Sequence, residues 1–206
     1  EREPGDDLIT RILREHVIPG RLTRDEFAEI GAMILRAGHD TTTNMIGTGT
    51  LLLLRDDALR ARLAADPSGL PRAIEEMLRF VSPVQFSPRR VAKVDVEVGG
   101  ETIRAGEGLF LSLPAANRDP AVFPAPEALD AGRDAVRHLA FGFGIHQCLG
   151  QILARVELRI VFDAILRRLP GLRLAVPADA IRFKDDMQIY GVHALPVAWD
   201  VDGARR

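Results

Sequence analysis

The only cysteine of the chain, Cys148, lies in the glycine-rich segment FGFGIHQCLG, residues 141–150, directly before a long amphipathic stretch. The three glycines of this segment allow the backbone to turn tightly and admit another group close to it. The apolar periodicity that follows predicts a helix over residues 149–169. Unpaired N–H groups and the dipole at a helix start favour a thiolate. The pattern predicts a cysteine with a chemical role, although a lone cysteine is most often a small buried apolar side chain.

A thiolate at this position is suited to act as a nucleophile or as a metal ligand. A zinc site with sulfur-rich coordination is excluded, because the chain has no second cysteine. Gly150 leaves the first helical turn without a side chain, so that a flat group could press against it. One thiolate beside such a surface suits the axial ligand of a haem iron. An enzyme with a cysteine nucleophile is the alternative from another class.

Composition narrows the partners and the compartment. The formal net charge is −2 and 47% of the residues are hydrophobic, so the chain can build a core and has no broad attraction to nucleic acid or anionic membranes. One cysteine excludes an internal disulfide framework and suits the cytoplasm. The longest apolar run, MIGTGTLLLL at residues 45–54, is too short to span a bilayer. We therefore expect a cytoplasmic protein without a nucleic-acid or membrane partner.

The chain is expected to be mainly α-helical with small antiparallel β-sheets. A capping box, Thr23 with Glu26, and the apolar spacing that follows predict the first long helix. Helices are predicted over residues 23–54, 57–65, 71–80 and 149–169. Alternation within residues 94–98 and 109–113, with Gly99–Gly100 as a turn, predicts strands, as does the pattern of residues 171–199. Residues 114–139 form a long irregular loop, which is usually functional or disordered.

The segment AGHDTTT, residues 37–43, interrupts the first long helix with poor helix-forming residues. Their summed propensities weaken the helix by about 2 kcal/mol. This segment is either a tolerated polar patch at a helix–helix contact or a local kink where backbone and hydroxyl groups face a ligand.

The segment EEMLR places Glu76 and Arg79 at i and i+3 on one helix face. Taken alone, such a pair is most often a solvated surface pair that contributes little stability.

Four residues of the cysteine segment stand at the spacing F-x-x-G-x-x-x-C-x-G: Phe141, Gly144, Cys148 and Gly150. This spacing resembles the haem-binding loop of the cytochromes P-450, the haem-thiolate monooxygenases. The preceding motifs, AGHDTTT and EEMLR, stand in the family's order, and the resemblance runs from GDDLITRIL to ALPVAW. It implies that residues 1–206 form the C-terminal, haem-binding half of a cytochrome P-450 fold.

The resemblance implies haem b as the cofactor, with the Cys148 thiolate as the axial ligand of its iron. The other implied haem contacts are Phe141, Gly142, Gly144, Gly150, Ala37 and Gly38. Arg90 and His146 are candidates for holding the haem propionates, because arginine pairs with carboxylates in bidentate geometry.

The same resemblance implies two catalytic residues on the first long helix. Thr41 would hydrogen-bond iron-bound dioxygen or water, and Asp40 would relay protons toward the distal oxygen. A threonine hydroxyl both donates and accepts hydrogen bonds, which a proton relay needs.

The resemblance further implies a structural triad of Glu76, Arg79 and Arg133, the last from the segment LDAGR. This buried triad would hold in place the loop that presents Cys148. Removing one partner of a buried ion pair costs about 3–5 kcal/mol. His138 is expected to be structural or exposed and is assigned no functional role.

The implied reaction inserts one oxygen atom from O2 into a small apolar substrate, with electrons from NAD(P)H through a ferredoxin-type donor. Residues 33–42 and the turn at residues 84–87 would line one side of the substrate pocket. Members of the family are about twice this length, so the chain is expected to lack much of that pocket. The alternative function is therefore a catalytically incompetent fragment, folded with or without haem. We also expect self-association through the apolar face left by the missing half.

Overall fold

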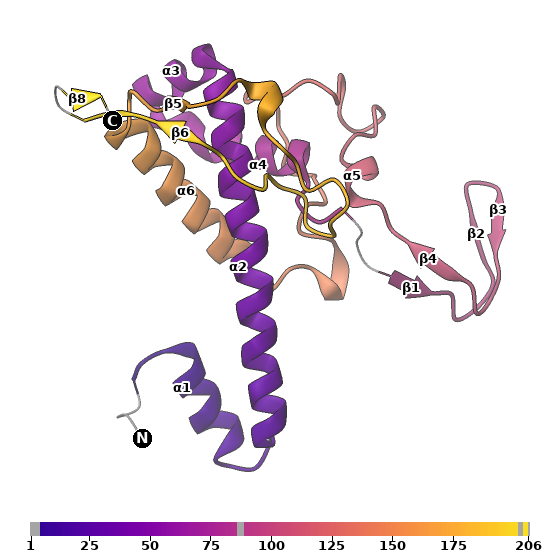
Figure 1. Ribbon diagram of the computed structural model, residues 1–206. Coiled ribbons are helices and arrows are strands. Elements are labelled where there is room, and N and C mark those ends of the chain that lie inside the picture. Colours follow the sequence, from indigo (N-terminus) through magenta and orange to yellow (C-terminus); the bar gives the residue numbers. More distant parts are fainter. Residues whose placement is uncertain (1–4, 86–88, 202–203, 206) are drawn as a thin grey trace. The chain divides into compact units, whose positions relative to one another are not determined.

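The structure, a computed structural model, describes residues 5–85, 89–201 and 204–205. The chain divides into two compact units, one up to Asp40 and one from Thr41 onward. Helix α2, Arg24–Arg55, contributes to both units (Figure 1). The turn expected to line the substrate pocket falls partly outside the described residues, because Phe86 and Ser87 are not among them.

The first unit contains α1, Leu8–Ile12, a π-helical turn, Leu13–Val17, and the first part of α2. The predicted capping box forms at the start of α2. The Glu26 N–H donates to Thr23 Oγ1 at 3.2 Å, and the Thr23 N–H donates to Glu26 Oε2 at 2.8 Å. These two bonds satisfy backbone donors that the helix itself leaves unpaired, so they confirm where the long helix begins.

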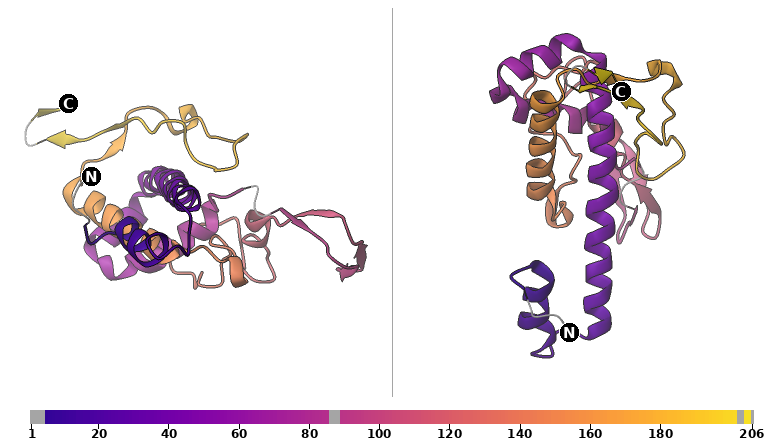
Figure 2. Two further views of the ribbon diagram at one scale, coloured as in Figure 1. Left: turned by 90° about the horizontal axis from the view of Figure 1, so that it is seen from below. Right: turned by 60° about the vertical axis from the view of Figure 1, so that its left-hand side comes forward.

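The core of the second unit lies between the rest of α2 and three further helices (Figure 2). These are α3, Asp57–Ala65, α4, Leu70–Val81, which follows a 3-10 turn at Pro67–Gly69, and α6, Gln151–Arg168. Helix α6 packs against α4, and its side chains Leu158 and Phe162 are fully buried. A Cβ on Gly49 of α2 would come within 2.4 Å of the Phe162 ring, so glycine is what allows α2 this close to α6.

The described strands form four two-stranded antiparallel sheets. The pairs are β1, Arg89–Val91, with β4, Gly108–Phe110; β2, Val96–Val98, with β3, Glu101–Ile103; β5, Arg173–Leu174, with β6, Val197–Ala198; and β7, Asp200–Val201, with β8, Ala204–Arg205. Gly99 and Gly100 make the predicted turn between β2 and β3, and both have positive φ. The prediction of a mainly α-helical chain with small antiparallel sheets is confirmed.

Several predicted boundaries are wrong. Strand β2 begins at Val96 rather than at residue 94, and within residues 171–199 only Arg173–Leu174 and Val197–Ala198 form strands. The strand prediction for residues 109–113 fails after Phe110, because Ser112 caps a short helix, α5, Leu113–Ala116, in which Pro114 occupies the first turn. Helix α6 begins at Gln151 rather than at residue 149, because Gly150 takes the N-cap position. Cys148 therefore precedes the helix instead of opening it.

Candidate functional site

The loop before α6 holds Cys148 by its backbone and leaves its side chain exposed. The Cys148 N–H donates to the Phe141 carbonyl at 2.8 Å, which closes the loop across a 3-10 turn at Gly144–His146. Gly142 and Gly144 have φ of 71° and 76°, a left-handed conformation that favours glycine. The alternative of a buried apolar cysteine is wrong, because Cys148 is exposed.

Large apolar side chains lie close to Cys148 in sequence, on both sides of it. Five of them, which we call the apolar rim, are exposed: Phe143, Ile145, Leu149, Ile152 and Leu153. A Cβ on Gly150 would meet nothing within 4 Å, so a flat group has room there. Within the described residues, no three His, Cys, Asp or Glu side chains gather to hold a metal ion. A single soft sulfur in an apolar setting fits a metal whose other ligands belong to a flat organic macrocycle such as haem.

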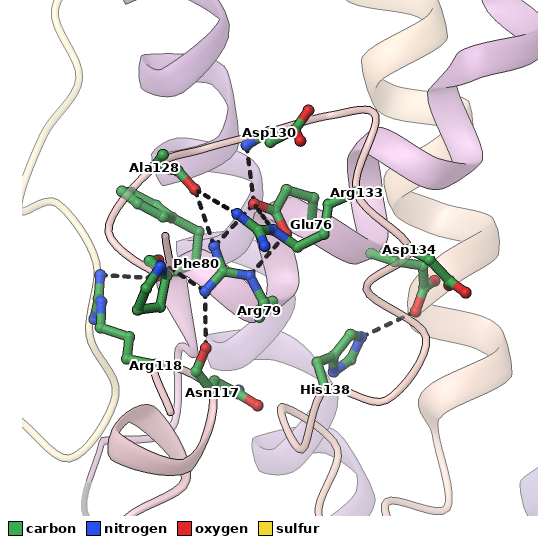
Figure 3. A network of polar contacts seen from close by, with 12 residues as sticks. Glu76, Arg79, Phe80, Asn117, Arg118, Ala128, Asp130, Arg133, Asp134 and His138 are labelled. Carbon is green, nitrogen blue, oxygen red and sulfur yellow. Dashed lines mark hydrogen bonds and ion pairs between the residues drawn. The ribbon is translucent and has the colours of Figure 1, made fainter. Parts of the chain in front are cut away.

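Glu76 and Arg79 of α4 form a fully buried ion pair (Figure 3). Arg79 donates from Nε to Glu76 Oε2 at 2.7 Å and from Nη2 to Oε1 at 2.8 Å, which is bidentate geometry. Arg133 joins them, because its Nε donates to Glu76 Oε1 at 3.2 Å. The structure thus brings the three expected residues of the triad together, and the solvated surface pair is excluded.

The two arginines of the triad bind the irregular segment through its backbone carbonyls. Arg79 donates to the carbonyls of Asn117, Pro126 and Ala128. Arg133 donates to those of Pro124, Ala125 and Ala128. The segment is therefore ordered by guanidinium groups bound to a buried carboxylate rather than by regular secondary structure.

A second buried polar residue, Asn117, ties the end of α4 to the approach of the cysteine loop. Its Nδ2 donates to Ser82 Oγ at 2.7 Å, and its Oδ1 accepts from the Leu139 N–H at 2.6 Å. Ser82, the C-cap of α4, has a φ of 44°, so the first of these bonds holds a left-handed serine in place.

Sequence reasoning missed a second ionic cluster, formed by Glu75, His138 and Arg155. Arg155 of α6 donates from Nε and Nη2 to the two Glu75 oxygens at 2.7 and 2.9 Å. His138 is buried, and its Nε2 lies 2.9 Å from Glu75 Oε2. Its Nδ1 accepts from the Ala140 N–H at 3.1 Å, which assigns the ring proton to Nε2. Of the two expectations for His138, the structure supports the structural one: the side chain is buried and links α4 to the backbone just before Phe141.

Opposing effects act on the pKa of Glu75. Burial raises it, but the hydrogen bonds from His138 and Arg155 and the charge of Arg155 outweigh burial, so that the pKa falls from 4.5 to about 2. The Glu75 carboxylate is thus ionised in the folded chain at neutral pH.

We expect Glu75→Gln to lower the free energy of unfolding at pH 7, and the difference from wild type to shrink as the pH falls from 4.5 toward 2. A carboxyl whose folded pKa is depressed stabilises the fold above its unfolded pKa and loses that contribution as the pH falls through the folded pKa. Urea unfolding of both proteins at a series of pH values measures this. Glu101→Gln, at an exposed position of β3, is the control. A difference that stays constant over this pH range would contradict the assignment.

The remaining predicted residues lie in exposed or partly exposed positions. Arg90 is exposed on β1, and its Nη1 donates to the Arg89 carbonyl at 3.0 Å. His146 is exposed at the end of the 3-10 turn. Ala37, Gly38 and Asp40 are exposed on α2, and Thr41 is partly buried. Residues 37–43 are α-helical without interruption, so the structure has no break in the helix there.

Comparison with known proteins places the chain and its fold in one class, the cytochromes P-450. The family model described as Cytochrome P-450 matches residues 70–191. The chain is 52% identical over 95% of its length to cytochrome P-450-SU2 of Streptomyces griseolus, and 49% identical over 96% to pentalenic acid synthase of Streptomyces avermitilis. The crystal structure of the cytochrome P-450 MoxA from Nonomuraea recticatena matches 97% of this chain at 49% identity, with a TM-score of 0.92.

The chain belongs to the cytochrome P-450 family. It covers 48% and 49% of the two curated relatives and 49% of the crystallised chain, which is about half of their length. The fold prediction is confirmed to this extent: the chain corresponds to about half of a cytochrome P-450. No helix within the described residues is long and apolar enough to cross a membrane.

Proposed function

We propose that this chain supplies the haem-binding part of a cytoplasmic haem-thiolate monooxygenase. The reaction inserts one oxygen atom from O2 into a small apolar substrate, and a ferredoxin-type donor delivers electrons from NAD(P)H. The observation that carries the proposal is the exposed Cys148, held at its backbone N–H and flanked in sequence by exposed apolar residues, in a chain of the cytochrome P-450 family.

The proposed haem contacts follow from this loop. Cys148 Sγ binds the iron, and haem, when bound, supplies the activation of dioxygen. Phe141 and the glycines at 142, 144 and 150 accept the flat macrocycle against the backbone. Arg90 and His146 donate to the propionates, and we assign Ala37 and Gly38 of α2 to the remaining haem contacts.

The proton-handling residues are proposed on α2. The Asp40 carboxylate takes up and releases a proton, and the Thr41 hydroxyl accepts it and donates it onward.

The test is the visible spectrum of the purified chain, reduced and exposed to carbon monoxide after haem is supplied. A strongly red-shifted Soret band is the expected result, because the thiolate donates electron density to the iron. A haem-bound chain with an unshifted band would overturn the proposal of thiolate ligation. A colourless chain whose Cys148 reacts readily with iodoacetamide would favour a cysteine nucleophile instead.

A catalytically incompetent, self-associating fragment is the second candidate. It is favoured by exposed apolar residues of α6 such as Val156 and Ile160. Substrate oxidation by the haem-loaded chain, supplied with a ferredoxin and its reductase, separates the two candidates. A correct thiolate spectrum without turnover would support the second candidate.

A further inference from the structure

Arg155 of α6 contacts two residues near Cys148, one that precedes the cysteine in sequence and one that follows it. Its guanidinium carbon lies 4.5 Å from the ring centroid of Phe141. Its Nη1 donates to Gln151 Oε1 at 2.9 Å. One side chain therefore spans the segment from the start of the loop to the first residue of the helix.

Both contacted residues hold the backbone of Cys148. The Phe141 carbonyl accepts from the Cys148 N–H at 2.8 Å, and the Gln151 N–H donates to the Cys148 carbonyl at 3.4 Å. The peptide groups on the two sides of the Cys148 Cα are thus held by the two residues that Arg155 contacts.

The guanidinium of Arg155 is itself held in one orientation. Glu75 accepts two bonds from it, at 2.7 and 2.9 Å, and a bidentate pair fixes the plane of the guanidinium. The buried His138 ring fixes the Glu75 carboxylate in turn, at 2.9 Å from Nε2 to Oε2. A side chain from α4 and one from the irregular segment therefore determine where Arg155 lies.

The loop needs such an external constraint. Gly142, Gly144 and Gly150 restrict the backbone little, so the loop sequence alone does not fix the direction of the Cys148 side chain. An axial ligand must present its sulfur along one direction, which requires positioning to within about 0.5 Å.

We propose that Arg155, oriented by Glu75 and His138, is the positioning residue that aims the Cys148 sulfur at its ligand. It acts through Phe141 and Gln151 and does not touch the sulfur's ligand itself. The part of this inference that concerns the sulfur's ligand rests on the proposed haem-thiolate function. The positioning of the Cys148 backbone can be measured without haem.

The first measurement is amide hydrogen exchange in the haem-free chain. Arg155→Ala is expected to speed exchange at Cys148 and Gln151 by about tenfold or more, because the charge-assisted contacts that order this segment are lost. The amides of Phe162 and Leu166, in the buried part of α6, are expected to exchange as in wild type. Arg159→Ala, an exposed arginine of the same helix, is the matched control and should leave both sets unchanged.

The second measurement is the carbon monoxide spectrum of the haem-loaded variants. Arg155→Ala is expected to reduce the share of haem with the red-shifted Soret band by about tenfold, for the same loss of order around the sulfur. Arg155→Lys keeps the charge but loses the planar fork and the stacking on Phe141, so we expect an intermediate share. A purely stabilising role would change thermal stability and leave this share as in wild type.

Wild-type exchange at Cys148 and Gln151 in a folded Arg155→Ala chain would overturn the inference. If that variant does not fold, Glu75→Gln and Arg155→Lys decide the matter by the same comparison of loop and helix amides. If wild type itself lacks the red-shifted band, the proposed function fails, and the exchange data still show whether Arg155 orders the cysteine.

Discussion

Arg79→Met is expected to lower the free energy of unfolding by about 3–5 kcal/mol, because it leaves the Glu76 carboxylate buried without its bidentate partner. Both side chains are 0% exposed, so water cannot replace the lost bonds. Arg133 remains on Glu76 Oε1, but its single bond at 3.2 Å does not restore those that Arg79 made. The carbonyls of Asn117 and Pro126 also lose their donor, and the Ala128 carbonyl keeps only the longer bond from Arg133, at 3.5 Å. The irregular segment therefore loosens together with the ion pair.

Urea unfolding at pH 7 measures the effect, with Arg72→Met as the control. Arg72 is an exposed arginine on the same helix, so the change in side chain is identical and only the buried contacts differ. The control is expected to stay within about 0.5 kcal/mol of wild type. A loss below about 1 kcal/mol for Arg79→Met would show that the buried pair contributes little net stability.

The long helices were predictable because their signals are local. The Thr23–Glu26 capping box marks the start of α2, and Pro71 lies in the first turn of α4. Such signals lie within a few residues of the boundary they set, so no distant contact is needed to read them. The boundary errors at Ser112 and Gly150 have the same local origin, since each residue is a cap that the apolar pattern hid.

The Glu76 triad was found because the family motif supplies it, whereas the Glu75 cluster has no comparable signal. The two carboxylates are adjacent on α4, so their side chains point to different sides of the helix. The partners of Glu75 lie 63 and 80 residues away in sequence. Arg155 follows three apolar residues in the first turns of α6, but nothing in the local sequence points to Glu75 as its partner.

Cys148→Ala is expected to abolish the red-shifted Soret band of the reduced carbon monoxide complex completely, because no other residue of this chain provides a thiolate. The fold is expected to survive, since Cys148 is exposed and its backbone bond to Phe141 does not involve sulfur. Methionine is the other sulfur-containing residue in the chain, but its thioether cannot form a thiolate. Met187→Ala, at a side chain that is 44% exposed, is therefore the control and should leave the band unchanged. A red-shifted band that persists in Cys148→Ala would assign the iron another ligand and remove the basis for a haem-thiolate enzyme. If Cys148→Ala loses the red-shifted band but retains haem, the chain binds the macrocycle without the iron–sulfur bond.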